Sequence, residues 1–271
     1  MDLLTGALLA SLLVLVALDR FAPARVFPRT RRWRVRGALW LVVSVLLSGV
    51  LPLLWDPFLA PYRLIDATGL GVAGGTIVGL VTLQLCTYWW HRALHRFEPL
   101  WRIHQMHHSA ERIDVWGAFY LHPLDVAGFA MAGSIGLTLI LGVDPMAAAI
   151  VNAFVTFCSL FQHANLRTPR WLGYLVQRPE SHCVHHERGV HAHNYGDIPL
   201  WDLVFGTFRN PAEWSGVGGY WDGASARTTD MLLLRDVTKT ASETPSPSTV
   251  ETMEDDALTP TGEPLARTSV A

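Results

Sequence analysis

Five long apolar segments constrain the fold of this 271-residue chain more than any other feature. They cover residues 3–18, 37–55, 67–90, 124–143 and 146–161. A helix needs about 20 apolar residues to cross a bilayer, so four or five of these segments are candidate spans. Half of the residues are hydrophobic and only 16% are charged, a balance typical of integral membrane proteins. We therefore expect an all-α membrane protein with about four to five transmembrane helices.

Some of these segments leave alternatives open. Residues 3–18 are slightly short for a span and could form a signal peptide, although no basic region precedes them. The segment at 67–90 is rich in glycine, which lets helices approach closely in a bilayer. Its glycines are Gly69, Gly71, Gly74, Gly75 and Gly79. Only a short link, residues 143–145, joins the last two segments, so they form either a spanning hairpin or a re-entrant pair.

Arginine residues between the first two segments predict the orientation of the chain. Asp19 is the only acidic residue beside this run, which consists of Arg20, Arg25, Arg29, Arg31, Arg32, Arg34 and Arg36. The next link, residues 56–66, has only Arg63. An excess of arginine marks the cytoplasmic side of a membrane. Alternate threading from that anchor places the N-terminus outside and every histidine on the cytoplasmic face.

Histidine is the most informative residue type for function. All 12 histidines lie between His91 and His193. Eight of them form three clusters, which are His91 and His95, then His104, His107 and His108, then His182, His185 and His186. Residues at i, i+3 and i+4 share a helix face, so each cluster can direct two or three imidazoles to a common point. Two such points would hold two metal ions in a helical cap on the cytoplasmic face.

Imidazole ligands limit which metal ions and which classes of metalloenzyme are compatible with the sequence. Neutral imidazole suits zinc, copper, iron and nickel. A single histidine is more often a polar helix-end or interfacial residue, but clustered buried imidazoles are costly unless a metal takes their lone pairs. A zinc protease of the His-Glu-x-x-His type is excluded, because Arg92 occupies the place of the catalytic Glu. The nearby residues Glu98, Glu111, Glu180 and Glu187 could orient ligand rings or be solvated surface charges.

Further motifs accompany the clusters. Residues 121–125 read Leu-His-Pro-Leu-Asp, residues 162–165 read Gln-His-Ala-Asn, and Asn-Tyr-Gly at 194–196 precedes Trp-Asp-Leu-Val-Phe-Gly-Thr at 201–207. Together with the His clusters, this ordered set resembles the fatty acid hydroxylase/sterol desaturase superfamily of integral-membrane di-iron oxygenases. The resemblance covers about residues 67–210.

The resemblance implies a set of ligands. Carried over by motif, they are His91, His95, His104, His107, His108, His163, His182, His185 and His186, with His122 and His193 in reserve. Some relatives have a further histidine where this chain has Ser159, so the coordination shell can differ. Residues expected to support the site from behind or to shape it are Asn165, Asn194, Tyr195, Gly196, Trp201 and Asp202. Cys183, between two implied ligands, is expected to pack rather than bind metal.

The resemblance also implies an activity. It predicts an oxidoreductase that hydroxylates or desaturates a lipid at an unactivated C–H bond, with two iron ions as cofactor and O2 as co-substrate. Zinc could replace iron in the purified protein. Sterol, fatty acyl, carotenoid and alkylglycerol substrates all remain compatible. The sequence contains neither a haem-binding module nor a dinucleotide fingerprint, so an external electron-transfer protein or reductase is expected.

Two other classes of membrane protein agree less well with the sequence. A non-catalytic His-rich metal-binding or transport protein would need polar residues along its spans, and these spans are nearly free of them. A membrane haem protein would leave most of the histidines unexplained. The sequence has no basic-aromatic stripe for nucleic acid, and the oligomeric state is open.

Four regions are expected along the chain. Residues 1–66 hold N-terminal transmembrane helices and the arginine-rich loop, and residues 67–210 hold the catalytic domain. Residues 211–235 form a C-terminal extension, and the polar residues 236–271 form a disordered tail. The Ala, Leu, Val and Arg usage suggests a bacterial chain, hence an inner-membrane location.

Overall fold

The computed structural model describes residues 3–240, and residues 3–238 belong to one compact unit. Its longer helices are α1 (Leu3–Phe21), α2 (Trp33–Leu59), α3 (Gly71–Arg96), α4 (Glu98–His108), α5 (Pro123–Ser134) and α6 (Pro145–His163). Shorter helices follow, namely α7 (Pro179–His185), α8 (Leu200–Val204) and α9 (Thr228–Leu232). A six-residue π-helix, Ile135–Ile140, extends α5. Two short strands, β1 (Ile65–Asp66) and β2 (Leu141–Gly142), pair in parallel.

The long helices confirm the predicted membrane architecture. Five helical stretches within residues 3–240 are long and apolar enough to cross a membrane. They are Leu3–Phe21, Trp33–Tyr62, Thr68–Arg96, Pro123–Ile140 and Pro145–His163. Each contains most of one predicted apolar segment, and several extend it by a turn or more. The chain is thus an all-α, multi-pass membrane protein.

Close helix packing brings three of the spans together. Helix α3 contacts both α5 and α6, while α2 packs on α5 and α1 packs on α6. Two of the glycines in α3 allow the approach, because a Cβ at Gly75 would stand 3.1 Å from Ala147 and one at Gly79 would stand 3.1 Å from Leu137. Gly69 has nothing within 4 Å, so close approach is needed at only some of the predicted positions.

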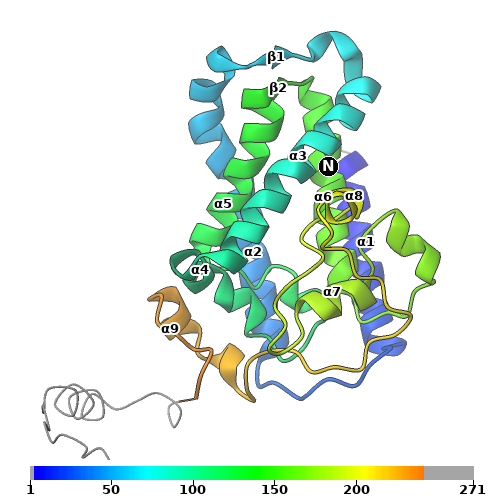
Figure 1. The fold of residues 1–271 in the computed structure, drawn as a ribbon, viewed down its shortest axis with the longest axis vertical. Helices are drawn as coiled ribbons and strands as arrows, with labels where there is room; N and C mark the ends of the chain where they lie inside the picture. Colours follow the sequence, from blue (N-terminus) through cyan, green and yellow to red (C-terminus); the bar gives the residue numbers. More distant parts are fainter. Residues whose placement is uncertain (1–2, 241–271) are drawn as a thin grey trace, which may run out of the picture. The chain divides into compact units, whose positions relative to one another are not determined.

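One end of the bundle is closed by the two strands. Figure 1 shows β1 and β2 beside each other at the top, where β1 follows α2 and β2 separates α5 from α6. Asp144 begins α6, since its carboxylate accepts a hydrogen bond from the backbone N–H of Met146 at 2.8 Å. The last two predicted segments therefore form a hairpin of two span-length helices.

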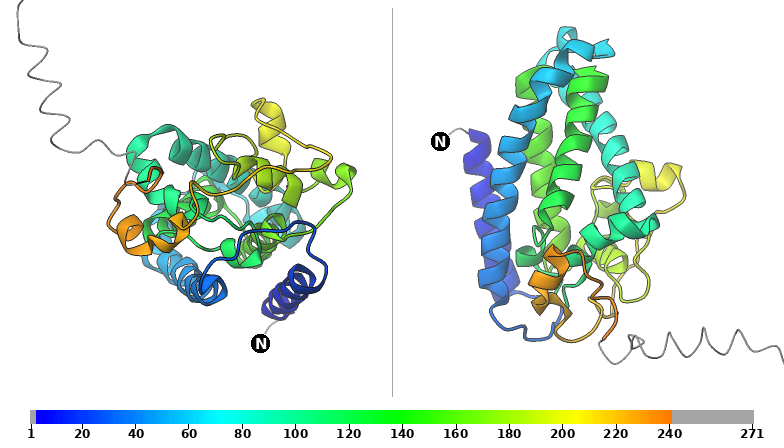
Figure 2. Two further views of the ribbon diagram at one scale, coloured as in Figure 1. Left: turned by 90° about the horizontal axis from the view of Figure 1, so that it is seen from below. Right: turned by 90° about the vertical axis from the view of Figure 1, so that its left-hand side faces the viewer.

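The arginine-rich loop and the histidine-bearing end of α6 lie at the opposite end of the bundle. The arginine-rich loop joins α1 to α2 there, as the right-hand view of Figure 2 shows. This loop lies against the residues that follow α6, because the backbone N–H of Ala24 donates to the carbonyl of Asn165 at 2.9 Å. The backbone N–H of Asn165 in turn donates to Asp19 at 2.7 Å. The loop and the C-terminal end of α6 thus lie at the same end of the bundle.

The C-terminal extension packs on this end of the unit. Val237 is buried, its backbone N–H donates to Gln105 at 3.1 Å, and its carbonyl accepts from Trp221 at 2.9 Å. Val237 lies within the predicted tail, and it is an apolar anchor within this polar stretch. Residues 241–271 of that predicted tail lie outside the described part of the chain.

Candidate metal centre

Nine histidines converge in two groups near the ends of the spans. The first group, called site 1, consists of His91, His95, His104, His108 and His185. The second group, called site 2, consists of His107, His163, His182 and His186. Within each group, one ligand atom per ring lies within 4.8 Å of every other. These are the nine ligands that the sequence resemblance implied, and neither group includes the reserve residues His122 and His193.

Four helices supply the rings. The last turns of α3 provide His91 and His95, and the final residue of α6 provides His163. Helices α4 and α7 provide five more, and His186 directly follows α7. The second and third sequence clusters each divide between the two groups, and two imidazoles of each cluster still meet at one point. Residues at i and i+4 keep one face, so His104 and His108 meet in site 1, whereas His107 turns to site 2.

The geometry of the nitrogens fits a metal ion. The Nε2 atom of His104 lies 3.1 Å from the Nε2 atoms of both His91 and His108. In site 2, the Nε2 atom of His182 lies 2.9 Å from that of His163 and 3.0 Å from that of His186. Two imidazoles bound at right angles to one metal, with bonds of about 2.1 Å, would have nitrogens about 3 Å apart.

Proton positions support the same conclusion. The Nδ1 atom of His91 lies 2.9 Å from the carbonyl of Tyr195, and that of His104 lies 2.7 Å from the Asp125 carboxylate. Because a carbonyl can only accept, Nδ1 of His91 carries the proton and its Nε2 presents a lone pair. A buried lone pair without a donor is costly, and the buried Nε2 atoms of His95 and His185 also have no hydrogen-bond partner. The residues present therefore fit bound metal at both sites.

Burial keeps these rings in the state that binds metal. Desolvation holds the pKa of His107, His108 and His186 well below the usual range, and neighbouring imidazoles lower it further. The same two causes lower the pKa of His182 and His185. All five rings are thus neutral at pH 7, with a lone pair available.

A single loop after α7 orients three rings of site 1. The carbonyls of His191, His193 and Tyr195 accept from the Nδ1 atoms of His95 at 2.9 Å, His185 at 2.8 Å and His91 at 2.9 Å, respectively. The carbonyl of every second residue along this loop therefore faces site 1. We call residues 191–195 the carbonyl loop.

The carbonyl loop has an uncommon backbone. His191, His193 and Asn194 have φ angles of 40°, 70° and 52°, in the left-handed region that side chains other than glycine rarely adopt. Asn194 is among the residues that tolerate it, and its side-chain amide donates to the carbonyls of Ser181 and Arg209.

Asp202 fixes the end of the carbonyl loop. Its two carboxylate oxygens accept from the backbone N–H groups of Tyr195 and Gly196, both at 2.9 Å. The hydroxyl of Thr207 donates to the same carboxylate at 2.6 Å, and Trp201 anchors the segment by donating to the carbonyl of Val81. The Asn-Tyr-Gly and Trp-Asp motifs thus act together as a clamp behind site 1.

Sequence reasoning missed the acidic residue that supports a ligand. Asp125, in the first turn of α5, is completely buried beside His104. The four glutamates near the clusters in sequence have other partners. Glu98 pairs with Arg102, Glu111 accepts from Ser225, and Glu187 accepts from Trp214. Asp125 was visible in the His-Pro-Leu-Asp motif, but its role depends on a contact with a residue 21 positions away.

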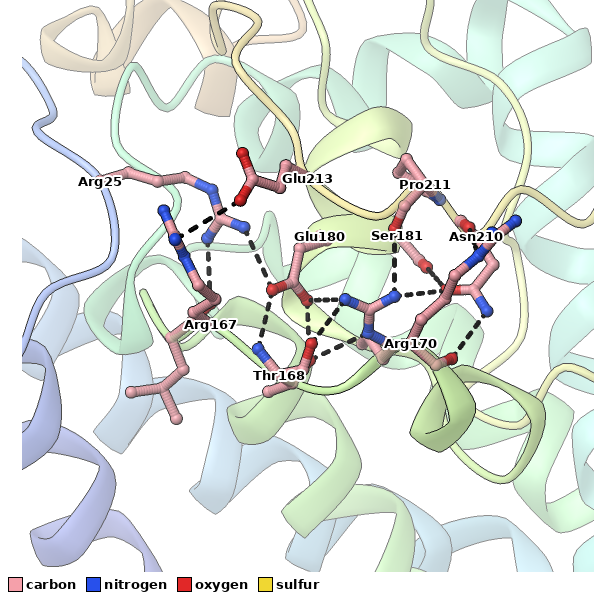
Figure 3. Close-up of polar contacts among 11 residues, drawn as sticks. Arg25, Arg167, Thr168, Arg170, Glu180, Ser181, Asn210, Pro211 and Glu213 are labelled. Carbon is pink, nitrogen blue, oxygen red and sulfur yellow. Dashed lines mark hydrogen bonds and ion pairs between the residues drawn. The ribbon is translucent and has the colours of Figure 1, made fainter.

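Site 2 is supported differently. The carbonyl of Ser159 accepts from Nδ1 of His163 at 2.7 Å, so the residue that replaces a histidine of some relatives still orients the ring one turn later. Helix α7 is held by a buried ion pair between Arg178 and Glu180, whose atoms lie 3.0 Å apart. Figure 3 shows Glu180 facing both Thr168 and Arg25 of the arginine-rich loop. Asn165 bonds to the backbone of Arg25, and therefore fixes that loop rather than a ligand ring.

The remaining candidates have structural partners. His122 begins α5, where its Nδ1 accepts from the backbone N–H of Leu124 at 3.1 Å. The Nδ1 atom of His191 lies 3.3 Å from Nδ1 of His108, and its ring packs on Trp101. Cys183 is buried, which raises the pKa of its thiol to about 12, and it belongs to neither histidine group. The thiol therefore stays protonated at pH 7.

Comparison with known proteins agrees with this geometry. A family described as fatty acid hydroxylase matches residues 76–207. This match and the relatives described below support the fatty acid hydroxylase/sterol desaturase superfamily that the sequence resembles. The part matched to the fatty acid hydroxylase family contains all nine histidines, Asp125 and Asp202, but not the arginine-rich loop.

Curated members of this superfamily show which proteins the chain is similar to. It is 33% identical over 140 residues to the ornithine lipid hydroxylase OlsE of Rhizobium tropici, covering 50% of this chain and 42% of that protein. It is 28% identical over 163 residues to the Delta(7)-sterol-C5(6)-desaturase of Nicotiana tabacum, covering 56% and 55%. The alkylglycerol monooxygenase of Caenorhabditis elegans is 32% identical over 129 residues, covering 45% and 24%. The chain thus spans about half or less of these relatives, and no solved structure matches it significantly.

Proposed function

We propose that this protein is an O2-dependent di-iron oxidoreductase that hydroxylates or desaturates a membrane lipid at an unactivated C–H bond. The observation that carries the proposal is the convergence of nine imidazoles in two adjacent groups at the ends of membrane-spanning helices. The names of the relatives, which include a lipid hydroxylase and a sterol desaturase, support the class of reaction. Two iron ions held by site 1 and site 2 would supply the activation of O2.

The protein's own residues would hold the two metal ions, orient the ligand rings and shield the site from water. The carbonyl loop, Asp125 and Ser159 fix the ligand rings, so the donor atoms are pre-organised before metal binds. Eight of the nine rings are buried, which excludes water from the site. Phe129 of α5 places an apolar ring 5.6 Å from the ring of His91, measured between centroids. An apolar substrate arriving between the spans would meet this side of site 1.

The reaction needs electrons that the protein does not store. Hydroxylation replaces a C–H bond by a C–OH bond, and it consumes one O2, two electrons and two protons while releasing one water. Desaturation removes two hydrogens from adjacent carbons with the same inputs and releases two waters. The electrons are proposed to come from an external electron-transfer protein or reductase that docks on the face bearing the histidines.

Orientation and location complete the proposal. The arginine-rich loop lies at the same end of the bundle as the histidine-bearing helix ends, which supports a cytoplasmic position for the metal centre. We place the protein in a bacterial inner membrane, with residues 67–210 as its catalytic domain.

Metal analysis of the detergent-purified protein tests the proposal. The protein reconstituted with iron should contain about two irons per chain, and the variant His107→Ala, His185→Ala should lose most of them. The loaded protein should then convert a lipid extract to an oxidised product only when O2 and a reductant are both present. The variant Arg167→Gln, at an exposed surface position, is the control for handling. Absence of bound metal in the wild-type protein after reconstitution would overturn the proposal.

A further inference from the structure

We propose that a pocket at the start of α2 binds the anionic headgroup of a membrane phospholipid. The pocket has a volume of about 300 Å³ and is lined by four arginines, which are Arg29, Arg32, Arg34 and Arg112. Trp33, the first residue of α2, forms part of its wall. The site is separate from both histidine groups and does not depend on the proposed function.

The charges in the pocket are largely uncompensated. Within residues 3–240, the side chains of Arg29, Arg32 and Arg34 make neither an ion pair nor a hydrogen bond. Within residues 3–240, Asp114 is the acidic residue that hydrogen-bonds to the lining, and Asp19 interacts electrostatically with Arg112. One carboxylate oxygen of Asp114 accepts from the Trp33 indole at 2.8 Å and the other accepts from Arg112 at 2.9 Å. Four arginines face the two nearby carboxylates of Asp114 and Asp19, so the pocket has an excess of positive charge.

The backbone adds to this preference for an anion. Arg32 precedes α2 without making a side-chain capping hydrogen bond, so the first turn of the helix keeps N–H groups without such an acceptor. Helix N-termini carry partial positive charge and favour phosphate oxygens. The 27-residue helix thus directs its positive end towards the same pocket as the arginines.

The surroundings favour a lipid over a soluble anion. Helix α2 is a candidate membrane span that starts at Trp33, so the pocket lies at the water-facing end of a span. Val35, which lines the pocket, begins an exposed apolar stripe. The stripe continues at helical spacing through Leu39, Val42 and Leu46, which are 59%, 56% and 61% exposed. Acyl chains can lie along this stripe while the phosphate occupies the pocket.

Arg112 gives the pocket a rigid floor. Its guanidinium donates to the carbonyl of Pro28 at 2.9 Å, which ties the arginine-rich loop to the segment after α4. The floor is therefore built from two parts of the chain that are far apart in sequence. A bound headgroup would bridge the loop, the start of α2 and this segment, so it should stabilise the folded protein.

The test is the thermal unfolding midpoint of the full-length protein in a neutral detergent, titrated with phosphatidylglycerol, phosphatidylcholine or inorganic phosphate. Phosphatidylglycerol at tenfold excess over its Kd should raise the midpoint by about 3–6 °C. Phosphatidylcholine, whose choline neutralises the phosphate, should raise it less. Inorganic phosphate, which lacks acyl chains, should raise it less at equal concentration.

Variants connect the effect to the pocket. Arg32→Gln with Arg34→Gln should weaken the phosphatidylglycerol Kd about 10- to 30-fold. Arg32→Lys with Arg34→Lys should retain most of the affinity, which separates charge from folding. The control Arg167→Gln with Arg235→Gln removes the same charge from surface positions outside the pocket. An unchanged Kd in the glutamine variant would overturn the proposal. An equal shift with inorganic phosphate, or with phosphatidylcholine, would overturn the anionic-lipid assignment.

Discussion

Nδ1 of His104 lies 2.7 Å from a carboxylate oxygen of Asp125, and both side chains are buried. The Nε2 atom of the same ring faces His91 and His108 in site 1. In the part of the chain that the structure describes, this is the one ligand ring whose second nitrogen contacts a carboxylate. A carboxylate behind a ligand imidazole raises the basicity of the ring. Site 1 should therefore bind metal more tightly than site 2.

Asp125→Asn should lower the metal affinity of site 1 about 10- to 100-fold, because the amide can still accept the hydrogen bond but no longer carries the charge. The measurement is iron retained per chain during dialysis against a graded chelator. Asp222→Asn, at a position whose side chain is 88% exposed, is the control and should behave as wild type. Equal retention by the Asp125 and Asp222 variants would contradict the role of the carboxylate.

His163→Ala should remove iron from site 2, since this ring lies within 3.1 Å of both His107 and His182. The two reserve histidines should be dispensable for metal binding. His122→Asn keeps a side chain that can begin α5, and His193→Asn keeps a residue that tolerates the left-handed backbone. Iron analysis of the three purified variants distinguishes these roles. A loss of iron in His193→Asn equal to that in His163→Ala would show that the ligand set is drawn incorrectly.

The sequence indicated several of the histidines that converge, because helical spacing is a local property. His91 and His95 needed only the i, i+4 rule, and the apolar segments needed only length and composition. The split of α4 between two sites was not predicted, because it depends on where α3, α6 and α7 lie around that helix. Local periodicity fixes which residues share a face, whereas tertiary packing decides what that face meets.

The supporting groups were less accessible to sequence reasoning. Backbone carbonyls carry no side-chain signature, so the contacts of His191 and His193 with ligand rings could not be read from residue type. Their left-handed φ angles are equally hidden, since the residue type does not distinguish these two histidines from the others in the chain. The predicted extension stops at residue 235, before the buried Val237. One buried apolar residue in a polar stretch gives only a weak sequence signal of packing.

Asp202→Ala should release the end of the carbonyl loop, because the backbone N–H groups of Tyr195 and Gly196 lose their acceptor. The loop orients His91, His95 and His185, all of which belong to site 1. We expect iron to fall towards one per chain while site 2 stays occupied. The readout is iron content together with the spectrum of cobalt substituted into the protein. Simultaneous loss of both metals at an unchanged unfolding midpoint would contradict a role confined to site 1.

Arg178→Met tests how α7 is held, because this arginine is fully buried and pairs with Glu180. It also donates to the carbonyls of Thr168 and Pro211. Removing one partner of a buried ion pair leaves an uncompensated charge and costs about 3–5 kcal/mol of unfolding free energy.

The exposed ion pair between Arg167 and Glu213, labelled in Figure 3, provides a matched control for the buried pair. Arg167 pairs with Glu213 at 3.4 Å, but these side chains are 71% and 72% exposed. An exposed pair contributes about 1 kcal/mol or less, so Arg167→Met should lower the thermal midpoint by at most about 4 °C. Arg178→Met should lower it by roughly 6 °C or more and also reduce the iron content, because α7 carries His182 and His185 and is directly followed by His186. Equal shifts in the two variants would show that the buried network does not hold the helix.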